Sequence, residues 1–312
     1  MNPLRIATRQ SPLAMWQTEY VADRLRAQNP DLPVELVPMT TRGDQVLDRP
    51  LAEIGGKGLF LKELEVAMVE GRADLAVHSC KDMPAEMESP FVIAALLERA
   101  DHTDALVSSQ FDSLASLPQG ARVGTSSLRR RVQLLTARPD LQVLDLRGNV
   151  GTRLGKLDAG QYDAIILASA GLMRLGLDQR IAARLAPPDF LPAAAQGVVA
   201  IECREDAAEL RQILAGLHHQ PTATITSAER AFTRALGGSC DVPIAAYAQV
   251  TDDRLQLIGL VASVDGKQQL RESIEGAAID AEQLGLDLAQ RLIDKGAQSI
   301  LGKSAPSTGT HA

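Results

Sequence analysis

The sequence predicts an α/β protein of two lobes, followed by a smaller α+β domain. Three observations lead to this prediction. Over the first two thirds of the chain, short aliphatic strands alternate with amphipathic helical stretches, the pattern of βα units around a mostly parallel sheet. Near Pro221 the pattern changes to a helix, then strands, then a closing helix. The chain has 312 residues, which is enough for two or three hydrophobic cores.

The first lobe is expected to open with a strand, a capped helix and a second strand. Ser11 and Pro12 supply the N-cap and a proline at the first helical position, so the helix begins at about Leu13. The third strand runs into the sequence SCKD at 79–82, at the strand end where α/β folds bind ligands. Strands are predicted at residues 4–8, 34–39 and 73–78, and helices at 13–27 and from the glycine-rich turn at 55–58 to about 70.

The middle third repeats this organisation and predicts a second α/β lobe. Thr125, Ser126 and Ser127 follow a short strand and cap a helix that starts at Leu128. A buried strand predicted at 197–202 lies far from the first third of the chain. This leaves open a chain that crosses back into the first lobe, and two crossings would make a hinge. Other strands are predicted at 121–124, 141–146 and 164–168, and helices from Leu128 and from about Val150.

The last third predicts a smaller α+β domain and a polar tail. A helix at 223–236 leads into the loop GGSCDVPI at 237–244, whose two glycines favour a sharp turn. The small polar residues of the final KSAPSTGTHA are typical of a disordered tail. Strands are predicted around 245–250 and 255–264, and a closing helix at 281–295. The expected domains are lobe one at 1–97 plus 198–217, lobe two at 102–192, the third domain at 220–303 and a disordered tail at 304–312.

Composition narrows the classes of function. The net charge is −7, so we expect neither a nucleic-acid surface nor a membrane surface, because both need an extended basic face. The longest apolar runs, such as 91–97, are far shorter than a membrane span, and a cytoplasmic location is expected. Cys80, Cys203 and Cys240 are odd in number and lie far apart without a cluster of histidine or cysteine ligands. Neither a disulfide framework nor a metal site is therefore predicted.

Two familiar motifs fail when they are compared with the residues. The phosphate-binding P-loop requires Ser or Thr after Gly-Lys, but Leu157 follows Gly155-Lys156. A nucleophile and base pair made of Ser79 and His78 is disfavoured, because adjacent residues on a strand point to opposite faces. The sequence therefore predicts neither a nucleotide cradle nor a serine hydrolase.

Cationic residues gather at loop and helix-start positions, and a solvated charged face is the plain alternative for such a set. Arg129 and Arg130, however, fall in the first turn of a capped helix, where cations oppose the helix dipole and an anionic ligand would remove the penalty. Arginine binds carboxylates through paired hydrogen bonds, so the set favours a ligand with several carboxylates. Asp82 is the candidate acid, base or cation-stabilising group. The set is Arg9, Lys57, Lys81, Arg129, Arg130, Arg131, Arg147, Arg153 and Arg174.

A series of motifs runs in order along nearly the whole chain. They are LRIATRQSPLA at 4–14, TRGD at 41–44, GGKGLF at 55–60, AVHSCKDMP at 76–84, GTSSLRRR at 124–131, LRGNVGTRL at 146–154, DAIILASAGLMRLG at 163–176, LPAAAQG at 191–197 and GGSCDVPI at 237–244. With these motifs the chain resembles the porphobilinogen deaminase family, also called hydroxymethylbilane synthases. The resemblance implies two type II periplasmic-binding-protein-like lobes with the active cleft between them, and a third domain that carries a covalent dipyrromethane cofactor.

The resemblance also implies roles for single residues. Cys240 would hold the dipyrromethane through a thioether, and Asp82 would be the catalytic carboxylate that contacts pyrrole N–H groups and stabilises a substrate cation. Glu53 stands where a lysine is expected, and Cys80 is interpreted as a packing variant of a larger apolar residue. Further cofactor-binding positions are Lys81, Thr125, Ser127, Arg129, Arg130, Asp44 and Gly171. Substrate-binding positions are Arg9, Ser11, Lys57, Arg147, Arg153, Arg174 and Gln196.

The implied function is that of a monomeric transferase. It would deaminate and polymerise four porphobilinogen molecules onto the dipyrromethane and release hydroxymethylbilane by hydrolysis, in tetrapyrrole (haem) biosynthesis. Two alternatives stay open. A non-enzymatic two-lobed protein that clamps an anionic small molecule would explain the arginines and the hinge, but not the GGSC loop. An acyl-transfer role for Cys240 would require a partner histidine, and the sequence indicates none.

Overall fold

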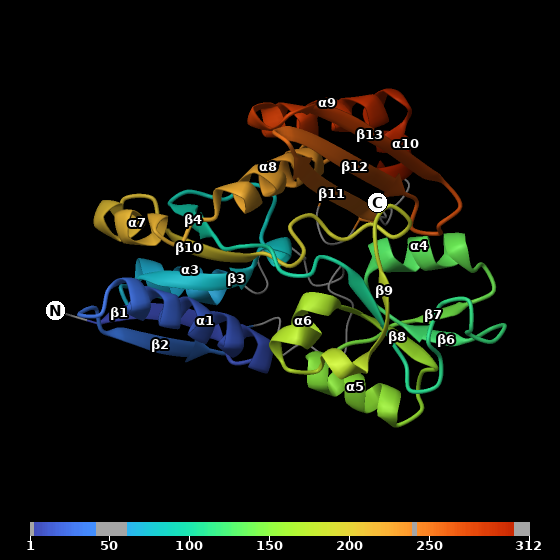
Figure 1. Ribbon diagram of the computed structural model, residues 1–312, viewed down its shortest axis with the longest axis horizontal. Helices are drawn as coiled ribbons and strands as arrows, with labels where there is room; N and C mark the ends of the chain where they lie inside the picture. The colour runs from blue at the N-terminus through green and yellow to red at the C-terminus, as the bar shows by residue number, and fades with distance from the viewer. Residues whose placement is uncertain (1–2, 42–60, 239–241, 303–312) are drawn as a thin grey trace, which may run out of the picture.

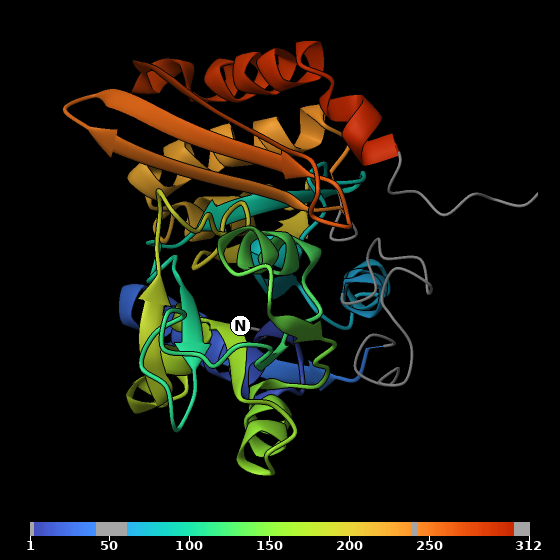
Figure 2. The same cartoon turned by 90° about the vertical axis from the view of Figure 1, so that its right-hand side faces the viewer.

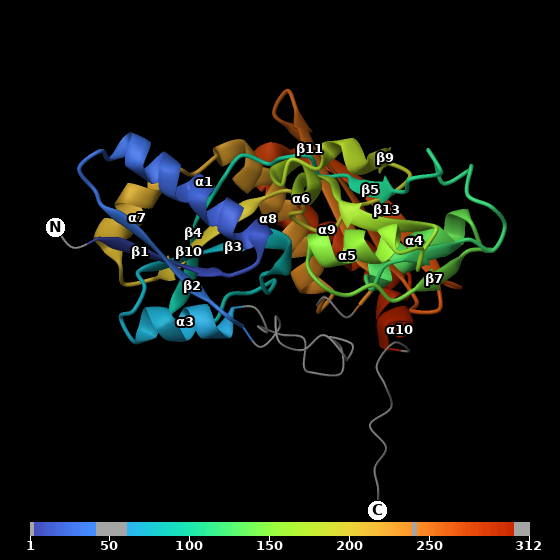
Figure 3. The same ribbon diagram turned by 90° about the horizontal axis from the view of Figure 1, so that it is seen from below.

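The computed structural model describes residues 3–41, 61–238 and 242–302, which form three regions, each built on its own sheet. The two lobes lie side by side, and the third domain packs across both of them (Figures 1 and 3). The glycine-rich turn predicted at 55–58 and the predicted tail at 304–312 lie outside the described residues.

The first lobe contains β1 (Leu4–Arg9), α1 (Pro12–Gln28), β2 (Val34–Met39), α3 (Lys62–Val69), β3 (Leu75–Ser79), the 3-10 helix η2 (Cys80–Asp82), β4 (Phe91–Leu96) and β10 (Val199–Arg204). Its strands follow the order β2-β1-β3-β10-β4. β1 pairs in parallel with β2 and β3, whereas β10 is antiparallel to both of its neighbours. Because β10 follows the second lobe in sequence, the chain returns to the first sheet there (Figure 1).

The second lobe contains β5 (Asp104–Val107), β6 (Arg122–Gly124), α4 (Leu128–Ala137), β7 (Gln142–Leu144), α5 (Val150–Asp158), β8 (Ala164–Ala168), α6 (Ser169–Arg174), the 3-10 helix η3 (Asp178–Arg180) and β9 (Ile181–Leu185). The strand order is β7-β6-β8-β5-β9. β6 is parallel to β7 and β8, and β5 is antiparallel to β8 and β9. The two sheets therefore have the same topology.

Each sheet receives its antiparallel strand from a segment that crosses between the lobes. β5 follows the first crossing, at 97–103, and β10 follows the second, at 186–198. This exchange of strands is the type II periplasmic-binding-protein-like arrangement that the resemblance implies. The predicted fold class, two such α/β lobes plus a small α+β domain, is confirmed.

The first lobe is completed by α7 (Ala208–Ala215), whose Leu214 lies in the core of that lobe. The third domain contains α8 (Gln220–Ala235), β11 (Ile244–Thr251), β12 (Arg254–Ala262), β13 (Gln269–Ala277), the 3-10 helix η4 (Ala278–Asp280), α9 (Ala281–Asp294) and α10 (Ala297–Gly302). The three strands form an antiparallel sheet, and α8 and α9 pack together against it (Figure 2). Leu260 and Ala262 pack with Val132 of α4. The helix that begins with Arg129 and Arg130 is therefore buttressed by the third domain.

Glycine allows α8 and α9 to approach each other closely. A Cβ atom at Gly285 would lie 2.3 Å from the carbonyl oxygen of Ala228, so the two backbones touch only because that side chain is missing. Gly259 makes the same kind of room for the ring of Phe232, which is fully buried. These contacts form the core of the third domain.

Four strands of the structure were not predicted: β4, whose apolar run at 91–97 was considered only as a membrane span, and β5, β9 and β13. β5 has only four residues and opens with an aspartate, β9 is a half-buried edge strand, and β13 alternates charged and small residues on an exposed edge. Such strands carry little of the apolar signal on which strand prediction depends. The strand predicted at 255–264 ends at Ala262, because Ser263 accepts a hydrogen bond from Gln268 N and begins a turn.

Candidate active site

The residues that follow β3 bring two charged side chains within electrostatic range of the second lobe. η2 follows the strand directly and carries Lys81 and Asp82. Asp82 is exposed, whereas Lys81 is half-buried and donates from Nζ to Oε1 of Gln196 at 3.2 Å. Burial lowers the pKa of Lys81 to about 8, although the negative charge of Asp82 acts to raise it. The geometry therefore holds a cation and a carboxylate side by side at a ligand-binding strand end.

The N-terminus of α4 provides the facing part of the second lobe. Ser127 is the N-cap, and its Oγ accepts from the backbone N–H of Arg130 at 3.4 Å. Thr125 is buried, and its Oγ1 accepts from the N–H of Ser127 at 3.2 Å. Both predicted cofactor-binding hydroxyl residues thus shape the turn that leads into α4.

Arg129 and Arg130 point into the protein and share one buried carboxylate. Arg129 Nη1 lies 2.7 Å from Asp104 Oδ2, and Arg130 Nη2 lies 2.6 Å from Asp104 Oδ1. Burial alone would raise the pKa of Asp104, but the two guanidinium groups outweigh it and hold the pKa far below its usual range. The cluster keeps a surplus positive charge, because one carboxylate faces two guanidiniums.

Asp104 was missed at the sequence level. It opens β5 immediately after the first crossing, where a charged residue in front of an apolar run was the available signal. The sequence predicts an anionic ligand for Arg129 and Arg130, and the structure adds Asp104 as a carboxylate of the protein that faces both of them. Asp104 therefore reduces the unfavourable interaction of the two arginines with the helix dipole, and a bound anion would reduce it further.

Gln196 joins the charged groups of the two lobes. Its side chain is fully buried, and its Nε2 donates to Oδ1 of Asp104 at 3.0 Å and to the carbonyl of His102 at 2.9 Å. Its Oε1 accepts from Lys81. One amide thus connects Lys81 in the first lobe with the Asp104 cluster in the second.

Arg153 brings further positive charge toward the same place. It is half-buried, and its Nε donates to the carbonyl of Gly148 at 2.7 Å. Burial lowers its pKa to about 10, and the charges of Arg130 and Arg147 lower it too, while Asp82 raises it. Residues of both lobes are therefore within electrostatic range of one another.

Arg174 and Gly171 of α6 lie where the two lobes touch. Arg174 Nη2 donates to the carbonyl of Gly197 at 2.7 Å, and its guanidinium carbon lies 5.7 Å from the ring centre of Trp16. A Cβ at Gly171 would come within 3.5 Å of Leu13, so α6 and α1 pack closely, as Figures 1 and 3 also show. The contacts described for Arg174 and Gly171 are with Gly197, Trp16 and Leu13, and not with Lys81 or Asp104.

Arg9 ends β1 and Ser11 follows it, and β1 is the neighbour of β3, the strand that leads to Asp82. β1 and β3 are parallel neighbours, so Arg9 at the end of β1 shares a sheet edge with the residues that follow β3. Ser11 caps α1 by accepting from the N–H of Ala14 at 3.3 Å, as predicted. Asp44, Lys57, Glu53 and Cys240 lie outside the described residues.

The glycines before Cys240 have the conformations that the sequence suggested. Gly237 has a positive φ of 65°, and a Cβ at Gly238 would lie 2.7 Å from Cγ2 of Thr233. Larger residues would strain or displace this end of α8. The loop that leads to Cys240 therefore requires both glycines.

The other two thiols and the histidine behave as structural groups. Cys80 is buried among apolar side chains, and burial raises its pKa to about 11; Cys203 is buried within β10. His78 Nε2 lies 2.7 Å from Oε2 of Glu202, while the hydroxyl of Ser79 accepts from Gln17. A hydrolase pair between His78 and Ser79 is thereby excluded.

Two family descriptions match the chain in order. Residues 4–212 match "Porphobilinogen deaminase, dipyromethane cofactor binding domain", and residues 223–294 match "Porphobilinogen deaminase, C-terminal domain". The chain belongs to the porphobilinogen deaminase family.

Curated relatives agree with this family assignment over almost their whole length. A porphobilinogen deaminase of Xanthomonas axonopodis pv. citri (strain 306) is 59% identical over 303 residues, which are 97% of this chain and 100% of the relative. One from Stenotrophomonas maltophilia (strain R551-3) is 59% identical over 301 residues, 96% of this chain and 99% of the relative. Among solved structures, a nutrient binding protein from Burkholderia cenocepacia bound to methionine covers 71% of this chain and 93% of its own, with 15% identity and a TM-score of 0.45.

The family's cofactor is dipyrromethane, and the charges of the site fit it. Lys81, Arg129, Arg130 and Arg153 supply four cations, against the carboxylates of Asp82 and Asp104. This surplus suits the acetate and propionate groups that a dipyrromethane carries. Across residues 3–41, 61–238 and 242–302, no group of side chains is arranged to hold a metal ion, and no helix is long and apolar enough to cross a membrane.

Proposed function

We propose that this member of the family is a transferase that condenses four porphobilinogen molecules onto a dipyrromethane held by Cys240 and releases hydroxymethylbilane by hydrolysis. The observation that carries the proposal is the surplus of cations around Asp82, contributed by both lobes and joined through Gln196. Each substrate unit brings two carboxylates, so a growing chain requires such a surplus.

Asp82 is the proposed catalytic residue. Loss of ammonia from porphobilinogen leaves a cation on the substrate's pyrrole, and the exposed carboxylate of Asp82 offsets that charge and accepts hydrogen bonds from pyrrole N–H. After the new carbon–carbon bond forms, the same carboxylate assists removal of the proton from the pyrrole carbon. When bound, the dipyrromethane would supply the free pyrrole carbon to which the first unit is added, and each later unit would be joined to the unit before it. Because Asp82 regains its starting state, one group serves every cycle.

The remaining site residues are assigned to two ligands, the cofactor and the growing substrate chain, and the cations among them are the proposed carboxylate-binding groups. Lys81, Arg129, Arg130, Thr125, Ser127, Asp44 and Gly171 are assigned to the cofactor, and Arg9, Ser11, Lys57, Arg147, Arg153, Arg174 and Gln196 to the substrate chain. Two of these assignments carry a structural role in addition. Gln196 is fully buried and positions Lys81, and Arg174 links the lobes through Gly197.

The domain limits, location and assembly state are part of the same proposal. We infer lobe one at 1–97 plus 198–217, lobe two at 102–192, a third domain at 220–303 and a tail at 304–312; the three sheets support this division. We further propose a cytoplasmic monomer that binds no nucleic acid. Light scattering coupled to size-exclusion chromatography tests the monomer.

The assigned role of Asp82 is tested by Asp82→Asn in the full-length protein that carries its cofactor. Removing a proton-transfer and charge-stabilising group lowers the rate of ammonia release by about 100-fold or more. Glu86→Gln is the matched control, because Glu86 is another exposed carboxylate four residues further along the same segment. A rate for Asp82→Asn within a few-fold of the control, with cofactor present, would sink the role. Reversible binding of porphobilinogen without ammonia release by the wild type would favour the non-enzymatic alternative.

A further inference from the structure

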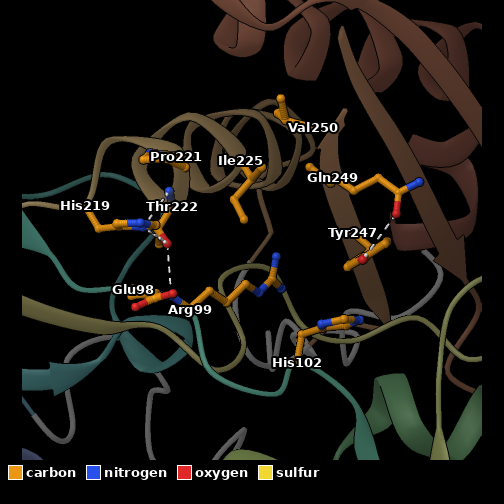
Figure 4. Close-up of a pocket in the computed structure, with 11 residues that line it drawn as sticks. Glu98, Arg99, His102, His219, Pro221, Thr222, Ile225, Tyr247, Gln249 and Val250 are labelled. Atoms are coloured by element: carbon orange, nitrogen blue, oxygen red, sulfur yellow. Dashed lines mark hydrogen bonds between the residues drawn. The ribbon is translucent and has the colours of Figure 1, made fainter. Parts of the chain in front are cut away.

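A cavity of about 280 Å³ lies where the third domain meets the first crossing between the lobes. Its walls are the crossing segment with Glu98, Arg99 and His102, the first turns of α8 with Ile225, and β11 with Tyr247 (Figure 4). None of the residues assigned above to cofactor or substrate lines it. The cavity is therefore separate from the proposed catalytic site.

Arg99 provides the cavity with a hydrogen-bond donor. Its side chain is only 8% exposed, its Nε donates to the carbonyl of Gln196 at 2.9 Å, and its Nη1 donates to Oε1 of Glu229 at 2.7 Å. Glu229 also accepts from the backbone N–H groups of Ala195 and Ala248. Within the part of the chain that the structure describes, Arg99 Nη2 is buried without a hydrogen-bond partner. A buried donor without an acceptor is unfavourable, so an acceptor brought by a ligand is favoured there.

His102 and Tyr247 give the cavity a flat, uncharged wall. Their rings stack with centres 4.5 Å apart and planes 26° apart, and the Arg99 guanidinium carbon lies 5.6 Å from the Tyr247 ring centre. Burial, together with the charge of Arg99, lowers the pKa of His102, and burial raises the pKa of Tyr247. Both rings are therefore neutral near pH 7. Such a wall favours an aromatic ring over a second charged group.

The charges and size narrow the ligand further. Arg99 is the single arginine of the wall, and the exposed carboxylate of Glu98 disfavours a second negative charge at the rim. Ile225 and Val250 add apolar surface. A volume of about 280 Å³ is at the small end of ligand cavities, which suits one ring rather than the several rings of a tetrapyrrole precursor.

We propose that this cavity binds a small aromatic monocarboxylate, with its carboxylate at Arg99 and its ring against His102 and Tyr247. The site is distinct from the carboxylate-binding residues of the cleft, and it does not depend on the proposed catalytic function. Arg99 donates a hydrogen bond to the backbone carbonyl of Gln196, and the side-chain amide of Gln196 accepts one from Lys81. The ligand therefore contacts a residue that is hydrogen-bonded to Gln196, which positions Lys81.

The proposal is tested with 4-fluorobenzoate and fluorine NMR on the full-length protein carrying its cofactor. We expect the wild type to bind with a Kd of about 1 mM, a reasonable value for a ligand of this size. Ile225→Phe fills the cavity and His102→Ala removes half of its flat wall, and each weakens binding by about fivefold or more. Arg147→Ala is the control for binding in the catalytic cleft and leaves the Kd unchanged.

Three results would overturn the proposal. The first is absence of binding by the wild type at about tenfold above the expected Kd. The second is a Kd that neither Ile225→Phe nor His102→Ala changes, when both variants have wild-type circular dichroism. The third is loss of binding in Arg147→Ala, which would place 4-fluorobenzoate among the cations of the cleft.

Discussion

The buried Asp104 cluster makes the strongest prediction about stability. Asp104→Asn keeps the size of the side chain but removes the carboxylate that faces Arg129 and Arg130, all three of them almost fully buried. Two guanidinium groups then stay inside the lobe without a counter-ion. Breaking a buried ion pair by removing one partner costs about 3–5 kcal/mol, because the remaining charge is left unpaired.

That cost is measurable by thermal unfolding. For both lobes unfolding as one unit of about 200 residues, it lowers the Tm by about 6–20 °C, which calorimetry on the full-length protein measures. Asp158→Asn is the matched control in the same lobe. Its pair with Arg180 is 2.6 Å long but the two side chains are 54% and 29% exposed, so the loss stays within about 1 kcal/mol.

The pH dependence of the Asp104 contribution has a definite sign. Because the pKa of Asp104 is lowered in the folded protein, its stabilising contribution is present above the unfolded value of about 3.9 and is lost as the pH falls through the folded value. The difference in Tm between wild type and Asp104→Asn is therefore constant from about pH 8 to pH 5 and shrinks only in stronger acid. A variant that unfolds together with Asp158→Asn at pH 7 would refute the reasoning.

Two further predictions concern other parts of the molecule. If Cys240 holds the cofactor as proposed, Cys240→Ser protein is made without it, and we expect Lys81 to titrate near pH 8 in that variant. The cost of burying the charge of Lys81 is then relieved as the pH rises from about 8 to about 10.4. In the wild type we expect the carboxylates of the cofactor to raise this pKa, which NMR of carbon-13 dimethylated lysines measures. Equal titration of Lys81 in both proteins would contradict its assignment. Gly285→Ala forces a Cβ against Ala228 and destabilises the protein by about 1–3 kcal/mol in urea unfolding, whereas Gly155→Ala, with open space in α5, stabilises it by about 0.5–1 kcal/mol. Changes of the same sign would show that the close contact of α8 and α9 is not tight.

Much of the fold could be predicted because its strong elements carry local signals. The helix predicted at 13–27 is observed as α1 at Pro12–Gln28, since Ser11 and Pro12 mark its start chemically. The strand at 34–39 is observed with the predicted bounds. β5 and β13 could not be predicted, because the first is too short to show a period and the second lies on an exposed edge where polar residues are tolerated.

The candidate site was predictable in its charges but not in its contacts. Arg129 and Arg130 were recognised from their place at a capped helix start, yet the sequence gives no sign that both turn inward to Asp104, on a strand 25 residues or more away. Gln196 is a similar case, because only the folded chain brings its amide between Lys81 and Asp104. Long-range pairing of this kind depends on the whole fold rather than on local pattern.

The most direct test of the whole account is the intact mass of the denatured protein beside that of Cys240→Ser, both made in a host that produces porphobilinogen. The account predicts that the wild type is heavier than its sequence by two condensed porphobilinogen units, and that Cys240→Ser has the mass of its bare chain. If both proteins match their bare sequences, the covalent scheme fails. Reversible clamping of an anionic ligand then becomes the better explanation for the cations between the lobes.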